Sequence, residues 1–147
     1  MSTGTVQLHR ILRASPDKVY RAFVEPDAFS RWLPPHGFCA SLVRMDVRVG
    51  GGFQMSFRNF TTGHSHAFSG TYKELEAGRR LSYTTVFEAP GPAGELTTTV
   101  ELWAVSCGTE LRVLQEGIPA AIPAEQCNLG WQESLEYLAR LVEPEIP

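Results

Sequence analysis

Apolar and polar positions alternate at the start of this chain and then change their period. In residues 5–13, "TVQLHRILR", Val6 and Leu8 alternate with polar side chains, which is the period of a strand with one buried face. Over residues 14–33 the apolar side chains recur three and four positions apart, which is the period of a helix. The chain is therefore expected to begin with a strand that leads into helical structure.

The helical region contains two separate start signals. In "ASPDKVYRAFV", Ser15 is a good N-cap, Pro16 suits the first helical position, and Asp17 is favourable at the positive end of the helix dipole. "EPDAFSRWL" repeats this arrangement with Pro26 and Asp27. We therefore expect two short helices in tandem, of which the second directs three apolar side chains inward: Phe29, Trp32 and Leu33.

From residue 39 to about residue 116 the chain has the pattern of successive strands. Glycine marks most of the gaps between six segments that are rich in Val, Thr, Tyr and Phe: "CASLVRMDV", "GGFQMSFRN", "HAFSGTYKELE", "RRLSYTTVFE", "ELTTTVELWAV" and "TELRVLQEG". Their short connections predict an antiparallel meander. In three of them the alternating side chains form rows that we expect to face a common interior: Phe53, Met55 and Phe57; Leu81, Tyr83, Thr85 and Phe87; and Leu96, Thr98, Val100 and Leu102.

The final segment, "IPAEQCNLGWQESLEYLARLVE", predicts a long helix. Pro123 can open it, and Pro144 disfavours its continuation because the residue before a proline avoids the helical region. Its apolar stripe has the spacing i, i+4, i+7 and i+10 or i+11 and consists of Trp131, Leu135, Leu138 and Leu141 or Val142. A helix of about twenty residues spans about 30 Å, which is enough to cross a small sheet.

These elements predict a single α+β domain over residues 1–147, in which a curved antiparallel sheet wraps around the long C-terminal helix. One helix about 10 Å across cannot cover such a sheet, so the sheet must curl, and the two short helices after the first strand close one end. The expected result is a largely apolar cavity with its mouth near the helix pair. The candidate ligand-binding residues are Trp32, His36, Phe53, Met55, Phe57, Tyr72, Tyr83, Phe87, Leu102 and Trp131.

The stretch "FSRWLPPHGF" places Trp32 and His36 on either side of two prolines that end the second helix. Trp32 either lines the cavity or plugs the core. His36 either meets a polar group of a ligand at the entrance or lies in a solvated loop. The sequence leaves both pairs of alternatives open.

Five stretches together resemble a known family: "ASPDKVYRAFVEPDAFSRWLPPHGF", "MDVRVGGGF", "SGTYKELEAGRRLSYTTVFE", "CGTELRVLQEG" and "GWQESLEYLARLVE". In this order they cover nearly the whole chain, which resembles the activator of heat-shock-protein-90 ATPase homologue-like proteins of the START-like (SRPBCC) superfamily. The resemblance implies the helix-grip, or Bet v-like, fold, a hydrophobic cavity between sheet and C-terminal helix, and for many members no established reaction. Many of these relatives have a histidine where this sequence has Cys127.

Composition narrows the classes of function. The chain has 147 residues, of which 43% are hydrophobic and 20% charged, with a formal net charge of −3, as in a globular domain. The arginines are scattered, so no nucleic-acid partner is expected. No apolar run reaches the roughly 18 residues of a membrane span, and the N-terminus has no signal-peptide pattern. Cys39, Cys107 and Cys127 lack C-x-x-C spacing, which favours a reducing cytoplasm.

Two motifs suggest bound ions and have structural alternatives. His64 and His66 share a face of an extended segment and offer two zinc ligands, but a zinc site needs three or four, so a polar hairpin tip is favoured. "VRVGGGFQ" lacks the lysine of a phosphate-binding loop, and its glycines favour a tight turn at positive φ. The sequence therefore predicts no metal and no cofactor.

Glu74 is a weak catalytic candidate. It has the parity of Phe68 and Tyr72, and a carboxylate held in an apolar pocket has a raised pKa and can act as a general base. The alternative is a glutamate near the rim that pairs with an arginine such as Arg48 or Arg58.

Gly130 interrupts the final helix, where glycine costs about 1 kcal/mol relative to alanine. Either the helix approaches the sheet closely at this point, or the missing side chain leaves room for a ligand. The adjacent Trp131 belongs either to the core or to a ligand site.

The sequence supports three functional hypotheses. The preferred one is binding of a small hydrophobic molecule in the cavity. The second is a cyclase- or hydrolase-like enzyme that uses an acid or base in the pocket. The third is a co-chaperone-like interaction module that stimulates an ATPase and so has a protein partner.

Overall fold

Over residues 4–89 and 91–147, the computed structural model contains one seven-stranded antiparallel sheet and three helices. In chain order the elements are β1 (Gly4–Leu12), α1 (Pro16–Val24), α2 (Pro26–Trp32), β2 (Phe38–Met45), β3 (Gly52–Asn59), β4 (Ser65–Glu76), β5 (Arg80–Phe87), β6 (Glu95–Val105), β7 (Gly108–Ile118) and α3 (Ala124–Val142). This succession confirms the predicted α+β class. No helix in these ranges is both long enough and apolar enough to cross a membrane.

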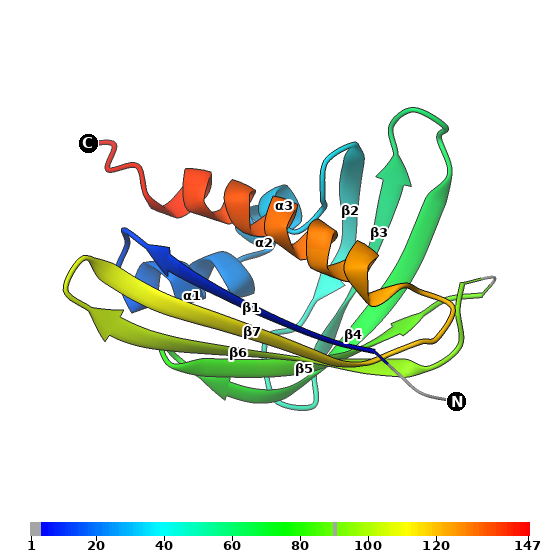
Figure 1. Cartoon of the computed structure of the whole chain (residues 1–147), viewed down its shortest axis with the longest axis horizontal. Coiled ribbons are helices and arrows are strands. Elements are labelled where there is room, and N and C mark those ends of the chain that lie inside the picture. The colour runs from blue at the N-terminus through cyan, green and yellow to red at the C-terminus, as the bar shows by residue number, and fades with distance from the viewer. Residues whose placement is uncertain (1–3, 90) are drawn as a thin grey trace.

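The sheet curves around α3, as the sequence predicts. Its strand order is β1-β7-β6-β5-β4-β3-β2, so the first strand returns to pair with the last and the two free edges are β1 and β2. Strands β1, β7, β6 and β5 form a floor beneath α3, and β2 and β3 rise at one end of the molecule (Figure 1). Helix α1 lies toward the other end, and α2 lies behind α3 between α1 and β2, both on the same side of the sheet as α3. This is the helix-grip arrangement.

The junction between α1 and α2 follows from its residues. Ser15 Oγ accepts a hydrogen bond from the backbone N–H of Lys18 at 3.2 Å, as predicted for the N-cap of α1. Glu25 has an extended backbone, with φ −91° and ψ 125°, because the residue before a proline is disfavoured in the helical region. Pro26 then begins α2. The chain therefore turns at this point, and the two short helices pack against each other.

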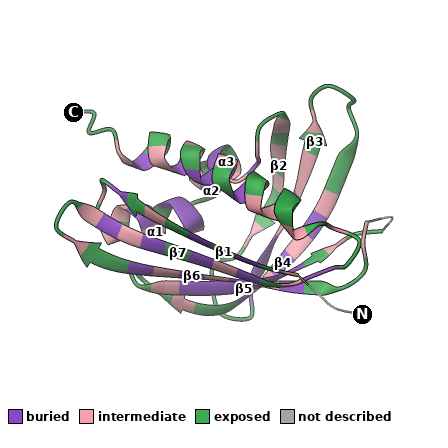
Figure 2. Ribbon diagram, in the orientation of Figure 1, coloured by how far each residue is buried: buried purple, intermediate pink, exposed green. Residues whose placement is uncertain are grey.

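Buried residues lie where the sheet and the helices face each other (Figure 2). The three predicted rows on β3, β5 and β6 point to this common interior, with buried members Phe53, Met55, Leu81, Tyr83, Thr85, Leu96, Thr98, Val100 and Leu102. On α3 the buried stripe contains Trp131, Leu135, Leu138 and Val142. Leu141 is exposed, so Val142 completes the stripe.

Close approach of β3 to β4 requires glycine. A Cβ atom on Gly52 would collide with the carbonyl oxygen of Gly70, and a Cβ atom on Gly70 would collide with the ring of Phe53. In the "GGG" run Gly50 alone has a positive φ, of 86°. The predicted tight turn therefore accounts for Gly50, whereas Gly51 and Gly52 are required because backbone atoms lie against them.

The two edge strands of the sheet are not flat, open ladders. α3 runs alongside β1, with Gly4 close to Ala124 at one end. At the other end the backbone N–H of Arg13 donates to Glu143 Oε2 at 3.0 Å. At the opposite edge a β-bulge at Val43 interrupts the register between β2 and β3.

Candidate ligand-binding cavity

A cavity of about 330 Å³ lies between the sheet and α3, at the small end of the usual range for small-molecule sites. Its lining is mostly aromatic and aliphatic: Phe38, Phe53, Phe57, Phe68, Tyr83, Phe87, Trp131, Leu33, Pro35, Leu96 and Ile122. The other lining residues are His66, Thr85, Gln115, Gln126, Cys127, Gly130 and Ser134. None of the described lining residues is Asp, Glu, Lys or Arg. The cavity is therefore a largely apolar site with few polar groups.

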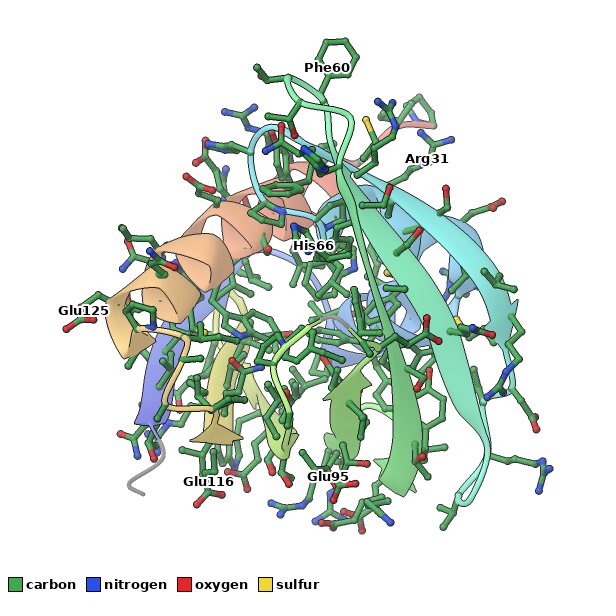
Figure 3. The ribbon with its side chains drawn as sticks, turned by 90° about the vertical axis from the view of Figure 1, so that its right-hand side faces the viewer. Arg31, Phe60, His66, Glu95, Glu116 and Glu125 are labelled. Atoms are coloured by element: carbon green, nitrogen blue, oxygen red, sulfur yellow. The ribbon has the colours of Figure 1, made fainter. Side chains whose placement is uncertain are left out.

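The cavity opens between α3 and the strands β3 and β4. Figure 3 looks toward this side, with His66 near the centre of the view. His66 on β4 and Gln126 on α3 are the exposed members of the lining. We expected the mouth near the α1–α2 pair, and Leu33 and Pro35, which follow α2, form one wall of the cavity.

Half of the predicted ligand-binding residues line this cavity, and the other half lie elsewhere. The lining members are Phe53, Phe57, Tyr83, Phe87 and Trp131. The helices α1 and α2 pack against the remaining part of the interior and fill it with side chains, as shown by Phe29, whose ring lies 5.5 Å from that of Phe53. Three predicted residues therefore belong to the packed core: Met55, Tyr72 and Leu102.

Trp32 is a core residue. Its side chain is 1% exposed, and its Nε1–H donates to the carbonyl oxygen of Ala22 at 2.7 Å. The indole makes edge-on contacts with Phe23 and Phe29, at centroid distances of 4.7 and 5.6 Å. Of the two alternatives for Trp32, the structure therefore favours the core plug that ties α2 to α1.

His36 lies outside the cavity. Its Nδ1 is 3.3 Å from Glu133 Oε2, and its backbone N–H donates to Glu133 Oε1 at 3.1 Å. The imidazole packs edge-on against Tyr137 at 5.1 Å. His36 therefore fastens the loop after α2 to the outer side of α3, while its neighbours Pro35 and Phe38 line the cavity.

Glu74 does not face the cavity, because a β-bulge changes the parity of β4. Tyr72 pairs with Tyr83, whereas Glu74 pairs with Ser82, so Lys73 is an extra residue that turns the following side chain outward. On the outer face Arg80 Nε donates to Glu74 Oε2 at 2.9 Å.

The environment of Glu74 also opposes its predicted chemistry. Hydrogen bonding from Arg80 lowers the pKa of Glu74, which is opposite to the shift that a general base in an apolar pocket needs. Arg80 also donates to Glu101 at 2.8 Å. The arginine partner is therefore Arg80, and the expectation of Arg48 or Arg58 is wrong.

The candidate ligand-binding residues include none of the smaller polar side chains of the lining. The sequence pattern favours a hairpin tip for His66, although it has the parity of Phe68 on β4 and lines the cavity. Cys127 lies four residues before Trp131 on α3 and so shares its face, and burial raises the pKa of the Cys127 thiol. Ser134 Oγ is 2.6 Å from the Leu33 carbonyl oxygen, so it joins α3 to the end of α2.

Among the described residues no cluster of three or more His, Cys, Asp or Glu side chains can hold a metal ion. His64 and His66 therefore have no third ligand among them. Within these ranges the histidine pair has no zinc-site geometry.

Gly130 faces the cavity rather than the sheet backbone. A Cβ atom placed on it would have no neighbour within 4 Å, and the residue lines the cavity. Close approach of α3 to the sheet therefore does not explain this glycine. The missing side chain leaves open space beside Trp131.

A family model described as "Activator of Hsp90 ATPase homolog 1-like protein" matches residues 13–143, which run from the end of β1 through α3. The chain belongs to this family. This family match agrees with the resemblance that the five sequence stretches carry.

Solved structures of similar proteins have the same fold. A Chromobacterium violaceum protein is 51% identical, with a TM-score of 0.94 over 96% of this chain and 98% of that chain. A Rhizobium loti protein is 27% identical, with a TM-score of 0.79 over 93% and 95%. A Rhodobacter sphaeroides protein is 20% identical, with a TM-score of 0.82 over 93% and 90%, and shows likeness of fold alone. No curated protein matches the chain.

One buried hydroxyl in this family member has an unusual environment. Tyr72 is 2% exposed, and no described protein group lies within hydrogen-bonding distance of its hydroxyl oxygen. Burial raises the pKa of Tyr72, and the nearby Tyr20 adds to this rise. Burial likewise raises the pKa of Tyr83, and the nearby Tyr72 adds to this rise, whereas Thr98 partly opposes it.

Substituting Tyr72→Phe should therefore stabilise the protein. Leaving a buried hydroxyl without a partner costs about 1–3 kcal/mol, so we expect the free energy of unfolding in urea to rise by about 1 kcal/mol. Tyr83→Phe is the matched control, since it removes a hydroxyl from a tyrosine that lines the cavity, and it should not raise the same quantity. A loss of stability in Tyr72→Phe would mean that its hydroxyl is hydrogen bonded.

Proposed function

We propose that this protein binds a small, mostly apolar molecule in the cavity between the sheet and α3, and that it does so in the cytoplasm. The observation that carries the proposal is a cavity of about 330 Å³ with an aromatic and aliphatic lining and an exposed mouth. Apolar surface that remains accessible in a folded domain often marks a binding site. Free Cys39, Cys107 and Cys127 fit a reducing compartment.

The empty space at Gly130 supports the same proposal. A helix-interior glycine lowers stability by about 1 kcal/mol relative to alanine, and no packing contact accounts for it here. Space for a guest next to Trp131 is a physical reason for a small residue at this point.

The two other hypotheses have less support. The enzyme hypothesis depended on a carboxylate in the pocket, and Glu74 instead pairs with Arg80 on the outer face. The hypothesis of a module that stimulates an ATPase rests on the family description alone. Ligand binding is therefore the function that the geometry supports best.

A thermal-shift screen tests the proposal. The native chain is heated with a panel of medium-chain fatty acids, naphthalene derivatives and aromatic polyketides, each at several concentrations. A ligand at a hundred times its dissociation constant should add about 2.7 kcal/mol to the free energy of unfolding and raise the melting temperature by several degrees. A flat response across the whole panel would contradict the proposal.

A further inference from the structure

A row of polar side chains crosses the inner face of the sheet. Tyr72, Tyr83, Thr98 and Gln115 occupy directly opposite positions on the neighbouring strands β4, β5, β6 and β7. Their exposed fractions are 2%, 4%, 0% and 9%, and both Tyr83 and Gln115 line the cavity. Burying polar groups lowers stability unless they are hydrogen bonded, so such a row requires a physical reason.

A side-chain hydrogen bond joins two neighbours in this row. Gln115 Nε2 donates to Thr98 Oγ1 at 3.1 Å. Thr98 is the direct neighbour of both Gln115 and Tyr83 in the row. The Tyr83 hydroxyl can donate a hydrogen bond, and Gln115 keeps its amide oxygen as an acceptor. The cavity wall thus offers one donor and one acceptor, on either side of Thr98.

The charge of the lining restricts the ligand further. None of the described lining residues is Asp, Glu, Lys or Arg, and the labelled acidic residues Glu95, Glu116 and Glu125 lie at the periphery of the view in Figure 3. An ionised group carried to the floor of such a cavity would lose its hydration without gaining the counter-charge of an Asp, Glu, Lys or Arg side chain, and His66 lies in the exposed part of the lining. The floor therefore favours a neutral polar group.

We propose that the cavity takes a neutral, mostly apolar molecule with one hydroxyl group, and that this hydroxyl hydrogen bonds to Tyr83 and Gln115. The inference rests on the proposed ligand-binding function and specifies the chemistry of its ligand. A hydroxyl matches this pair of residues because it donates one hydrogen bond and accepts another, whereas an ether only accepts. The apolar body of the molecule then lies among the aromatic residues, with Trp131 on α3 opposite the sheet.

Four probes of similar size test this inference by calorimetric titration at pH 7: naphthalene, 1-methoxynaphthalene, 1-naphthol and 1-naphthoate. We expect 1-naphthol to bind up to about tenfold more tightly than naphthalene, because tenfold corresponds to about 1.4 kcal/mol, near the upper value of one net hydrogen bond. 1-Methoxynaphthalene should fall between them, and 1-naphthoate should bind most weakly.

Variants connect the preference to the polar row. Tyr83→Phe and Gln115→Leu should each reduce the advantage of 1-naphthol over naphthalene to about twofold or less. Thr97→Val is the matched control, since Thr97 neighbours Thr98 on β6 but belongs neither to the row nor to the cavity lining, and it should keep the full advantage. If Gln115→Leu does not fold, Tyr83→Phe alone decides the matter, because it removes a single hydroxyl.

The outcomes separate the inference from the proposed function. Equal affinity of the native chain for naphthalene and 1-naphthol, or tightest binding of 1-naphthoate, would overturn the inference and leave ligand binding intact. A preference for 1-naphthol that survives both Tyr83→Phe and Gln115→Leu would also overturn it. Absence of binding for all four probes would contradict the proposed function for molecules of this size, and the inference with it.

Discussion

Gly130→Leu should abolish ligand binding while it makes the protein more stable. The new side chain would project into the cavity, where a Cβ atom meets nothing within 4 Å, and occupy space that a guest needs. The leucine side chain and a ligand cannot occupy the same part of a closely packed cavity. We therefore expect the affinity for 1-naphthol or any other bound probe to fall by at least about tenfold. Leucine is also a far better helix former than glycine, so the free energy of unfolding should rise by about 0.5–1 kcal/mol.

The opposite signs of these two effects make the experiment decisive. Gln132→Leu places the same side chain on the exposed side of α3 and should leave probe affinity unchanged. Gly130→Ala should stabilise by up to about 1 kcal/mol and weaken binding only slightly, since a methyl group fills little of the cavity. Affinity is measured by calorimetric titration and stability by urea denaturation. Native affinity in a folded Gly130→Leu protein would show that ligands bind elsewhere.

Trp32→Ala should remove most of the stability of the domain. Truncation of a buried aromatic residue to alanine typically costs about 3–5 kcal/mol, and here the loss includes the indole hydrogen bond to Ala22 and the contacts with Phe23 and Phe29. Because domains of this kind have a total stability of about 5–15 kcal/mol, the variant should be close to unfolding at 37 °C. Urea denaturation followed by tryptophan fluorescence and circular dichroism measures the change.

The chain supplies a matched control for Trp32→Ala. Trp103 is 40% exposed, and its ring lies 5.0 Å from the guanidinium carbon of Arg112 on the outer face of the sheet. Trp103→Ala should therefore cost about 1 kcal/mol or less, as expected for an exposed cation–π pair. Similar losses in the two variants would argue against Trp32 as the residue that joins the short helices to the core.

Local patterns in the sequence predicted the elements and their order, because each pattern reflects which side of an element is buried. Period-two rows placed Tyr83 and Thr98 on the inner face, and the spacing of Trp131 and Leu135 placed the stripe of α3. Proline and serine positions fixed the start of α1 and the break before α2. These features are determined by interactions between residues that are close together in the sequence.

The features that could not be predicted from the sequence depend on contacts between elements that are far apart in the chain. Counting by twos along β4 put Glu74 inside, but the bulge at Lys73 reverses the parity, and no local signal marked it. The division of the interior into a packed part and a hollow part depends on where α1 and α2 settle on the sheet. This is why Met55 and Leu102 lie in packed core, whereas His66 lines the cavity.

The irregular margins of the sheet have a consequence for behaviour at high concentration. An exposed, flat terminal strand is a template on which other chains add by backbone pairing, and this is the usual route to edge-to-edge aggregation. Here one margin is shielded by the neighbouring α3 from Gly4 to Arg13, and the other is bent at Val43. Although the protein has an apolar cavity, its irregular edge strands should therefore disfavour pairing with the strands of other copies.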